Sequence, residues 1–194
     1  ARGTPLVGLE PACLAAFRDE LPGLFSDHPV ATRLAGQSFL FSEFLDRFVP
    51  EAKFPNALSG MALAQIHCHH HAILDVGAEQ RLFSRLGLEA ETMASSCCGM
   101  AGAFGFEDHK YEISQRIAEA ALLPRLRAAE PGTLVLADGF SCREQIEQAT
   151  GRPTRHVAEA TAAALGVHVE AGELRTPIGK HAATLGLIGL AALG

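Results

Sequence analysis

Five cysteines are the residues of this 194-residue chain that are best suited to chemistry: Cys13, Cys68, Cys97, Cys98 and Cys142. The third and fourth are adjacent, and adjacent cysteines rarely bond each other because a disulfide needs a particular Cα separation. Thiolates are soft ligands that bind iron–sulfur clusters and zinc. We therefore predict a thiolate site for an iron–sulfur cluster in an electron-transfer domain, and zinc stays open as the alternative metal.

The surroundings of the cysteines suit such a site. Gly99, with further glycines three and six residues later, would let backbone amides approach the sulfurs closely. His67 and His71 flank Cys68, and we expect them to lie just outside the metal ligands, although a polar helix start would look the same. Arg143 would neutralise thiolate charge or cap a helix.

The elements expected to position these residues are strands that alternate with helices. Short apolar runs predict buried strands at 6–9, 61–66, 89–93 and 133–137. Amphipathic stretches and breakers predict helices at 12–21, 30–48, 72–86, 111–129, 143–149 and 157–165. This order favours an α/β fold, a parallel Rossmann-like sheet with helices on both faces. The cysteines follow the predicted strands, so they would meet at the carboxyl edge of the sheet.

Two segments share one plan. Residues 6–13 and 135–142 each contain an apolar strand, an acidic residue, a turn and a cysteine that opens a helix. We infer two related halves: residues 1–59 as the end of a truncated first half, 60–166 as a complete second half, and 167–194 as an apolar tail. The chain does not begin with Met, and we expect it to be a piece of something longer.

Composition excludes several classes of protein. The net charge of −6 and the pI near 5.8 are unlike a nucleic-acid binder, and the chain has no Trp and one Tyr on which bases could stack. An odd, sparse set of cysteines fits a reducing compartment, so we expect a cytoplasmic protein. The apolar tail leaves peripheral association with the inner face of the membrane open.

Three segments resemble the cysteine-rich CCG domain. They are His67-Cys68-His69, then Cys97-Cys98-Gly99-Met100-Ala101-Gly102-Ala103-Phe104-Gly105-Phe106-Glu107, and then Asp138-Gly139-Phe140-Ser141-Cys142-Arg143-Glu144-Gln145-Ile146. That domain occurs in heterodisulfide reductase, in glycolate oxidase iron–sulfur subunits and at the carboxyl terminus of large FAD-linked oxidases, some of which oxidise D-2-hydroxy acids. The similarity covers about residues 6 to 165.

The resemblance implies a ligand set and partners. Cys68, Cys97, Cys98 and Cys142 match the family's cysteines, which implies a 4Fe-4S cluster with Cys13 as an extra or substitute ligand. Gly139 and Glu10 stand where the fuller pattern has a further cysteine. FAD would lie in an upstream domain, next to ferredoxin-like domains, and electrons would leave towards a quinone or a redox protein.

The leading hypothesis is therefore the electron-transfer part of a flavin-dependent oxidoreductase, a fragment that would not turn over substrate alone. A structural zinc-binding interaction domain is the alternative. A thiol enzyme that uses the adjacent cysteine pair is a third possibility.

Overall fold

The computed structural model describes residues 3–93 and 97–167 of the chain. Its strands are β1 (Leu6–Gly8), β2 (Ser38–Leu40), β3 (Met61–Gln65), β4 (Glu89–Thr92) and β5 (Leu134–Ala137). Its α-helices are α1 (Pro11–Ala15), α2 (Leu21–Leu24), α3 (Pro29–Gly36), α4 (Phe41–Phe48), α5 (Cys68–Ile73), α6 (Val76–Leu86), α7 (Asp108–Glu119), α8 (Leu122–Arg127), α9 (Phe140–Thr150) and α10 (Val157–Ala164). A π-helical turn at Ala16–Glu20 joins α1 to α2, and a 3₁₀ turn at Phe104–Phe106 precedes α7.

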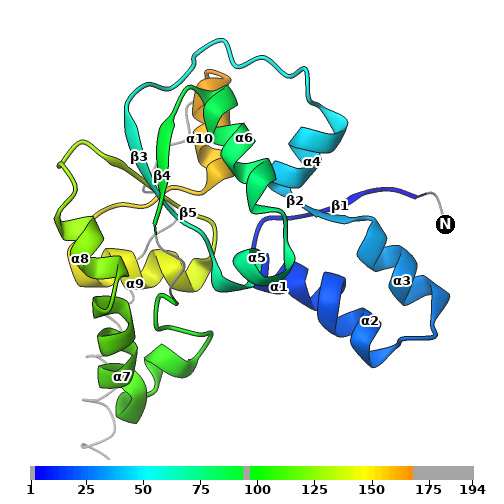
Figure 1. Cartoon of the computed structure of the whole chain (residues 1–194), viewed down its shortest axis with the longest axis horizontal. Coiled ribbons are helices and arrows are strands. Elements are labelled where there is room, and N and C mark those ends of the chain that lie inside the picture. The colour runs from blue at the N-terminus through cyan, green and yellow to red at the C-terminus, as the bar shows by residue number, and fades with distance from the viewer. Residues whose placement is uncertain (1–2, 94–96, 168–194) are drawn as a thin grey trace, which may run out of the picture.

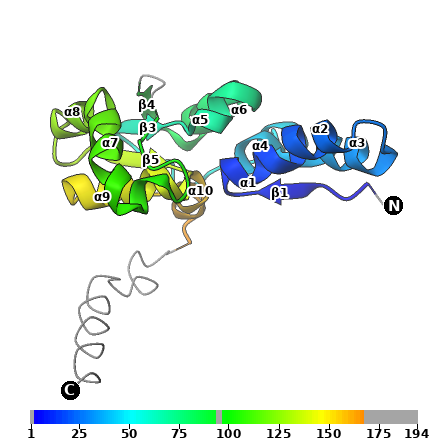
Figure 2. The ribbon, with the colours of Figure 1, turned by 90° about the horizontal axis from the view of Figure 1, so that it is seen from below.

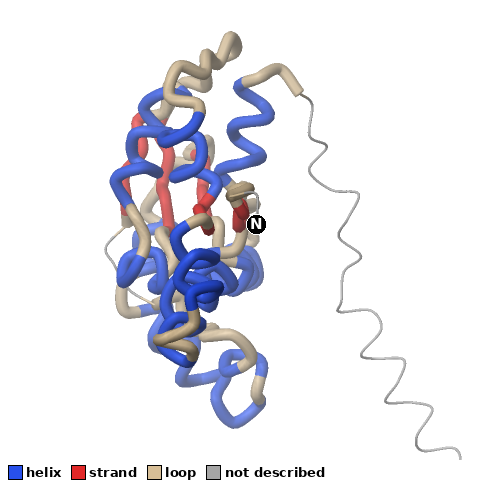
Figure 3. The backbone as a smooth tube through the Cα atoms, turned by 90° about the vertical axis from the view of Figure 1, so that its right-hand side faces the viewer, coloured by secondary structure: helices blue, strands red, loops and turns tan. Residues whose placement is uncertain are grey.

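The larger sheet is parallel and has the strand order β4-β3-β5. Figure 1 shows it in the left half of the molecule, and Figure 3 shows its strands between helices. On one face, Leu63 and Val135 pack with residues of α7, α8 and α9. On the other face, Ala62 and Leu136 pack with residues of α6 and α10. Because successive strand side chains point to opposite faces, each strand supplies both cores, and the predicted parallel α/β fold with helices on both faces is confirmed.

In the part of the chain that the structure describes, a second sheet consists of β1 and β2, which also pair in parallel. Figure 2 shows β1 with α1 to α4, on the opposite side from α7, α8 and α9. The prediction that the first strand is buried was wrong, because Val7 is 39% exposed. The prediction was also wrong for β4, because this strand lies at the edge of its sheet and exposes Glu89 and Glu91 to solvent.

The predicted helix over 30–48 was wrong in its middle. The chain leaves α3 at Gly36, and Ser38 to Leu40 form the buried strand β2 before α4 begins. The sequence has an apolar helical face on either side of this short segment, so the helical periodicity continues across it and the strand cannot be recognised from the pattern. Pairing with β1, a contact distant in sequence, decides its conformation.

Two other helix boundaries differ from the predictions. The first helix continues through a π turn and past Pro22 to Leu24, since this proline occupies the first turn of α2, where no N–H partner is required. The predicted helix over 111–129 is broken into α7 and α8. Pro124 cannot donate to the carbonyl four residues earlier and its ring crowds that group, so the helix must restart before it.

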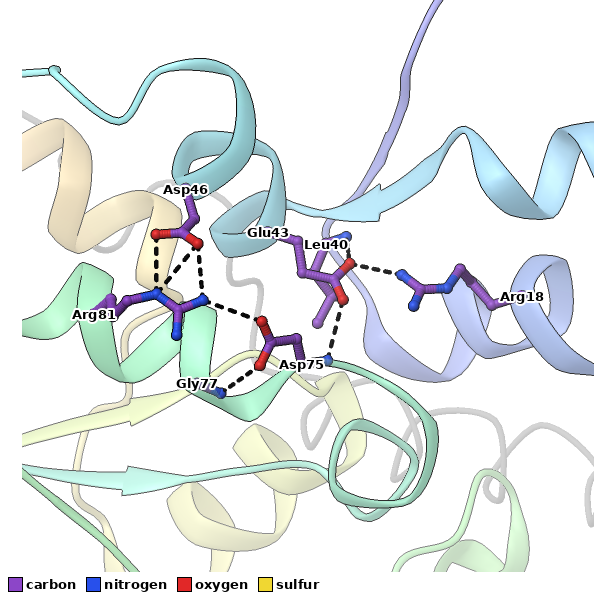
Figure 4. A network of polar contacts seen from close by, with 7 residues as sticks. All are labelled: Arg18, Leu40, Glu43, Asp46, Asp75, Gly77 and Arg81. Carbon is purple, nitrogen blue, oxygen red and sulfur yellow. Dashed lines mark hydrogen bonds and ion pairs between the residues drawn. The ribbon is translucent and has the colours of Figure 1, made fainter.

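A buried carboxylate ties the two sheets together. Figure 4 shows Glu43 of α4 accepting hydrogen bonds from Arg18 Nη1 at 2.8 Å, from the Leu40 backbone N–H at 2.9 Å and from the Asp75 backbone N–H at 3.1 Å. Beside it, Arg81 of α6 donates two hydrogen bonds to Asp46 Oδ2 and one to Oδ1, and another to the Asp75 carboxylate. This network fixes α4 and the turn before α6 relative to each other.

The two sheets repeat one order of elements. The order β1, α1, β2 and α4 matches the order β5, α9, a bridge at Arg155 and α10, with the π-helical turn, α2 and α3 inserted between α1 and β2. In both cases the last helix has a glutamate at its third position, Glu43 or Glu159, which accepts the backbone N–H of the residue before the helix. The division at residues 59 and 166 stays a prediction. Nearly all of the predicted tail, residues 168–194, lies outside the described residues.

Candidate metal centre

Four of the predicted cysteines follow the carboxyl ends of the three strands in the larger sheet. Cys68 is the first residue of α5, three residues after Gln65, the end of β3. Cys97 and Cys98 follow β4, and Cys142 lies in the first turn of α9, after β5. The parallel pairing of these strands puts all three segments at one edge. Their identity as ligands stays a prediction.

Cys98 and Cys142 form the buried part of this edge. Their exposed fractions are 4% and 2%, and the Cys142 thiol donates a hydrogen bond to the Cys98 sulfur. This bond, with the backbone N–H groups of Met100 and Ala101, lowers the pKa of Cys98 to about 7 although burial opposes the shift. The same hydrogen bond, followed by burial, raises the pKa of Cys142. Cys98 is therefore the preferred thiolate of the pair.

The loop conformation explains how those amides reach the sulfur. Gly99 has φ +93° and Ala101 has φ +44°, so the backbone turns back on itself directly after Cys98. A Cβ atom at Gly99 would collide with the backbone carbonyl oxygen of Ser114 on α7, so only glycine fits there. Successive N–H groups in such turns form a concave anion-binding surface. The predicted role of Gly99 beside the cysteines rests on this geometry.

Cys97 and Cys68 form the more accessible part. Cys97 is half-buried, and burial raises the pKa of its thiol although the Gly99 N–H donates to the sulfur at 3.3 Å. Cys68 is exposed. Both lie within electrostatic range of Cys142, whose pKa they raise further. The structure thus brings four thiols from three segments into mutual interaction.

Cys13 is exposed on α1. The residue near it that contacts α9, the helix of Cys142, is Glu10. Glu10 caps α1 by accepting the Ala12 N–H at 3.2 Å, and its other carboxylate oxygen accepts the Phe140 N–H of α9 at 2.7 Å. Glu10 thus joins the first turns of α1 and α9. Sequence reasoning noted this residue only as a departure from a cysteine pattern, and no local signal could show a contact across 130 positions.

The histidines divide into three environments. His67 is buried and caps α5, because its Nδ1 accepts the His69 N–H at 3.2 Å, and burial lowers its pKa. A Cβ at Gly139 would collide with the His67 ring, so this ring occupies the space that a larger residue at 139 would need. His71 is exposed, and the modest burial of its ring lowers its pKa.

His70 is the buried histidine that the sequence did not single out. It is 1% exposed and its Nδ1 lies 2.9 Å from the Glu79 carboxylate. Burial alone would lower the pKa of His70, but the hydrogen bond and charge of Glu79 raise it. The pair lies on α5 and α6, so it holds the segment that carries Cys68 against the next helix.

Charged groups next to Cys142 are engaged with each other. Arg143 Nε donates to Thr154 Oγ1 at 3.3 Å, and its Nη2 lies 3.6 Å from the Glu159 carboxylate. Asp138 accepts the Val157 N–H at 2.8 Å, and burial raises its pKa, followed by the nearby Glu79 charge. The predicted role of Arg143 in neutralising thiolate charge stays a prediction.

The donor set fits a polynuclear cluster better than one zinc ion. A tetrahedral zinc site with four thiolates at about 2.3 Å holds its sulfurs about 3.8 Å apart. Within residues 3–93 and 97–167, the only group of three or more metal-capable donor atoms within 4.8 Å of one another is His67, Cys68 and His69. The four thiols are therefore spread more widely. An iron–sulfur cluster binds each thiolate through a different iron, and amides near the sulfurs stabilise its charge.

Comparison with known proteins gives relatives that are much longer than this chain. It is 35% identical over 163 residues to a D-2-hydroxyglutarate dehydrogenase of Pseudomonas putida and 31% identical over 160 residues to one of Pantoea ananatis. Each match includes 81% of this chain and 15% of the relative. The chain is also 29% identical over 159 residues to one subunit of the anaerobic glycerol-3-phosphate dehydrogenase of Escherichia coli, covering 80% of the chain and 39% of that subunit.

No family model matches the sequence, and no solved structure matches it. The relatives are named as dehydrogenases or as a subunit of one, so the chain is similar to a region of larger oxidoreductases. Among the described residues, no helix has both the length and the apolar character needed to cross a membrane.

Proposed function

We propose that this chain is the electron-transfer region of a larger flavin-dependent oxidoreductase and that Cys68, Cys97, Cys98 and Cys142 hold a 4Fe-4S cluster. The observation that carries the proposal is the placement of these four thiols after the carboxyl ends of β3, β4 and β5, with Cys98 and Cys142 buried. The lowered pKa of Cys98 supports it, because thiolates, not thiols, bind metals. The position of Cys98 after a strand of a parallel sheet agrees with the general placement of sites in this kind of fold.

The residues of this chain have separate tasks in that centre. Buried Cys98 and Cys142 would anchor the cluster, and the amides of Met100 and Ala101 would stabilise its negative charge. Exposed Cys68 would mark the side from which electrons enter or leave. When bound, the cluster supplies one-electron transfer.

The residues proposed around the ligands receive unequal support. Gly99 is required by the loop, and His67 lies with its Nδ1 3.9 Å from the Cys68 sulfur. Cys13 remains a proposed extra or substitute ligand, on an exposed helix next to the Glu10 contact. His71 is proposed only from its place in the sequence.

The whole protein would oxidise a 2-hydroxy acid, with hydride transfer to FAD in a domain outside this chain. The names of the Pseudomonas and Pantoea relatives support this substrate class, and the small share of their length that the chain matches supports flavin and ferredoxin-like partner domains. A quinone or a redox protein would accept the electrons. We place the protein in the cytoplasm, with contact at the inner face of the membrane as a further proposal.

The open sheet of the first half supports the proposed division at residue 59. Among the described residues, β1 pairs only with β2, whereas its counterpart β5 has β3 on its other side. A parallel sheet of two strands is an incomplete unit, since parallel sheets are normally buried on both faces and larger. The free edge of β1 would pair with a strand of the preceding domain.

The test is anaerobic purification or reconstitution of the chain with iron and sulfide, followed by measurement of iron, acid-labile sulfide and the electron paramagnetic resonance signal of the reduced form. We expect about four irons per chain, a count that follows from the 4Fe-4S assignment. Cys98→Ala and Cys142→Ala should lose the cluster.

Cys13→Ser tests the proposed extra ligand separately, because its thiol is exposed and lies on α1. Full iron loading of Cys13→Ser would restrict the ligands to the four strand-end cysteines, whereas loading as low as that of Cys98→Ala would show that those four are not sufficient. Stoichiometric zinc without iron, lost in Cys98→Ala and Cys142→Ala, would instead favour the structural zinc domain.

A further inference from the structure

The start of α5 contains a second, smaller set of metal-ligand atoms. His67 Nδ1, Cys68 Sγ and His69 Nδ1 all lie within 4.8 Å of one another. The Cys68 sulfur is 3.9 Å from His67 Nδ1 and 3.8 Å from His69 Nδ1. Imidazole nitrogen with thiolate sulfur is a donor set typical of zinc.

The spacing of these atoms nearly equals that of an occupied site. With zinc–sulfur bonds of about 2.3 Å and zinc–nitrogen bonds of about 2.0–2.1 Å, a tetrahedral ion holds sulfur and nitrogen about 3.6 Å apart. Both sulfur–nitrogen distances exceed this value by only about 0.2–0.3 Å, judged against that same geometry. The sulfur is therefore close to its bonded separation from both nitrogens, and closing the set requires rotation of the exposed His69 side chain.

The two rings differ in their freedom to move. The His67 and His69 rings are stacked, with centroids 5.2 Å apart and planes inclined by 16°, and a ring nitrogen binds a metal in the plane of its ring, so one ring must turn before both nitrogens can reach one ion. The His67 ring packs against Gly139. His69 and Cys68 are exposed, so an ion and its fourth ligand can reach them from solvent.

We propose that, in the cluster-free chain, His67, Cys68 and His69 bind a single zinc-type divalent ion with a fourth position open to water or an external thiolate. On binding, His67 Nδ1 exchanges the His69 N–H for the metal, and the Cys68 thiol releases its proton to solvent. The proposal goes beyond the electron-transfer function, because it does not involve Cys97, Cys98 or Cys142. Cys68 belongs to both sets, so the single ion and the complete cluster would exclude each other.

The test uses the whole chain, freed of metal and kept reduced under anaerobic conditions, with Co²⁺ as a spectroscopic probe that Zn²⁺ displaces. We expect one equivalent of Co²⁺ to give a sulfur-to-cobalt charge-transfer band and the visible bands of tetrahedral cobalt. Cys68→Ser should lose the charge-transfer band. His69→Ala should bind at least about tenfold more weakly, since loss of even an outer-shell partner weakens metal binding by about 10- to 100-fold.

His109→Ala is the matched control, an exposed histidine on α7 whose loss should leave cobalt binding unchanged. Cys142→Ala separates this proposal from the cluster, because it should abolish iron loading and keep the cobalt spectrum. Wild-type affinity in His69→Ala would overturn the proposal, and so would loss of the charge-transfer band in Cys142→Ala. The comparison of His69→Ala with His109→Ala involves exposed residues alone, so it does not depend on the folding of buried variants.

Discussion

The cysteine loop contains a matched pair of glycines that tests how its backbone shapes the metal centre. Gly99 has φ +93° and Gly102 has φ +64°, so both adopt the left-handed conformation that side chains disfavour. They differ in the space around them. A Cβ at Gly99 would overlap the Ser114 carbonyl oxygen of α7, whereas nothing lies within 4 Å of a Cβ at Gly102.

The expected effects on stability follow from this difference. Gly102→Ala introduces a conformational cost of about 1–2 kcal/mol, offset by about 0.4–1 kcal/mol from the lower entropy of the unfolded chain. We expect a net loss of about 0–1.6 kcal/mol from these two effects. Gly99→Ala has the same two effects and adds overlap with a helix backbone, which costs about 1–3 kcal/mol, so the free energy of unfolding should fall by about 1–5 kcal/mol. The melting temperature should fall by about 2–4 °C for each kcal/mol in a chain of this size.

Urea unfolding followed by circular dichroism measures both variants in the metal-free chain, and iron content after reconstitution gives the functional result. Gly99→Ala should also lose cluster loading, because relief of the overlap moves the Met100 and Ala101 amides away from Cys98. Gly102→Ala should load iron normally. Equal stability of the two variants would refute the proposed close approach between the loop and α7, and normal loading of Gly99→Ala would refute the role of the amides.

Three other substitutions test separate contacts. Glu43→Ala should lower the free energy of unfolding by about 2–4 kcal/mol, because it removes the acceptor of the Leu40 and Asp75 backbone amides and of half-buried Arg18. Exposed Glu51→Ala should change it by less than about 0.5 kcal/mol in the same urea titration. The raised pKa of His70 contributes stability that is fully present below its ordinary value of 6.5 and is lost as pH rises through the folded value. The stability difference between wild type and His70→Gln should therefore shrink from about pH 6 to about pH 9, and a constant difference would contradict the buried ion pair. Cys142→Ala removes the thiol that lowers the pKa of Cys98 to about 7, so thiolate absorbance in the metal-free chain should titrate at higher pH, and an unchanged midpoint would exclude that hydrogen bond.

The sequence by itself determined the class of fold and the positions of two main strands along the chain. The apolar runs at 61–66 and 133–137 correspond to β3 and β5, because strands buried on both faces need continuous apolar residues. Alternation with helices predicted parallel pairing, which is the pairing of every strand in the described part of the chain. The position of each cysteine directly after a strand predicted their common edge.

The tertiary structure decided features that depend on contacts distant in the sequence. β2 is a strand only because β1 pairs with it, and β4 is half-exposed because it lies at an edge of the sheet. Local periodicity predicts neither feature, because it shows which residues are apolar and not which other segment packs against them.

The same division holds inside the candidate centre. Residue types and spacing predicted which thiols lie at this edge, and their role as ligands stays a prediction, but they did not predict that Cys98 and Cys142 form the buried pair. They also did not predict that Glu10 reaches α9 or that His69 lies as close to Cys68 as His67 does. These contacts depend on side-chain directions at the ends of separate elements, and such directions are fixed only when the elements pack together.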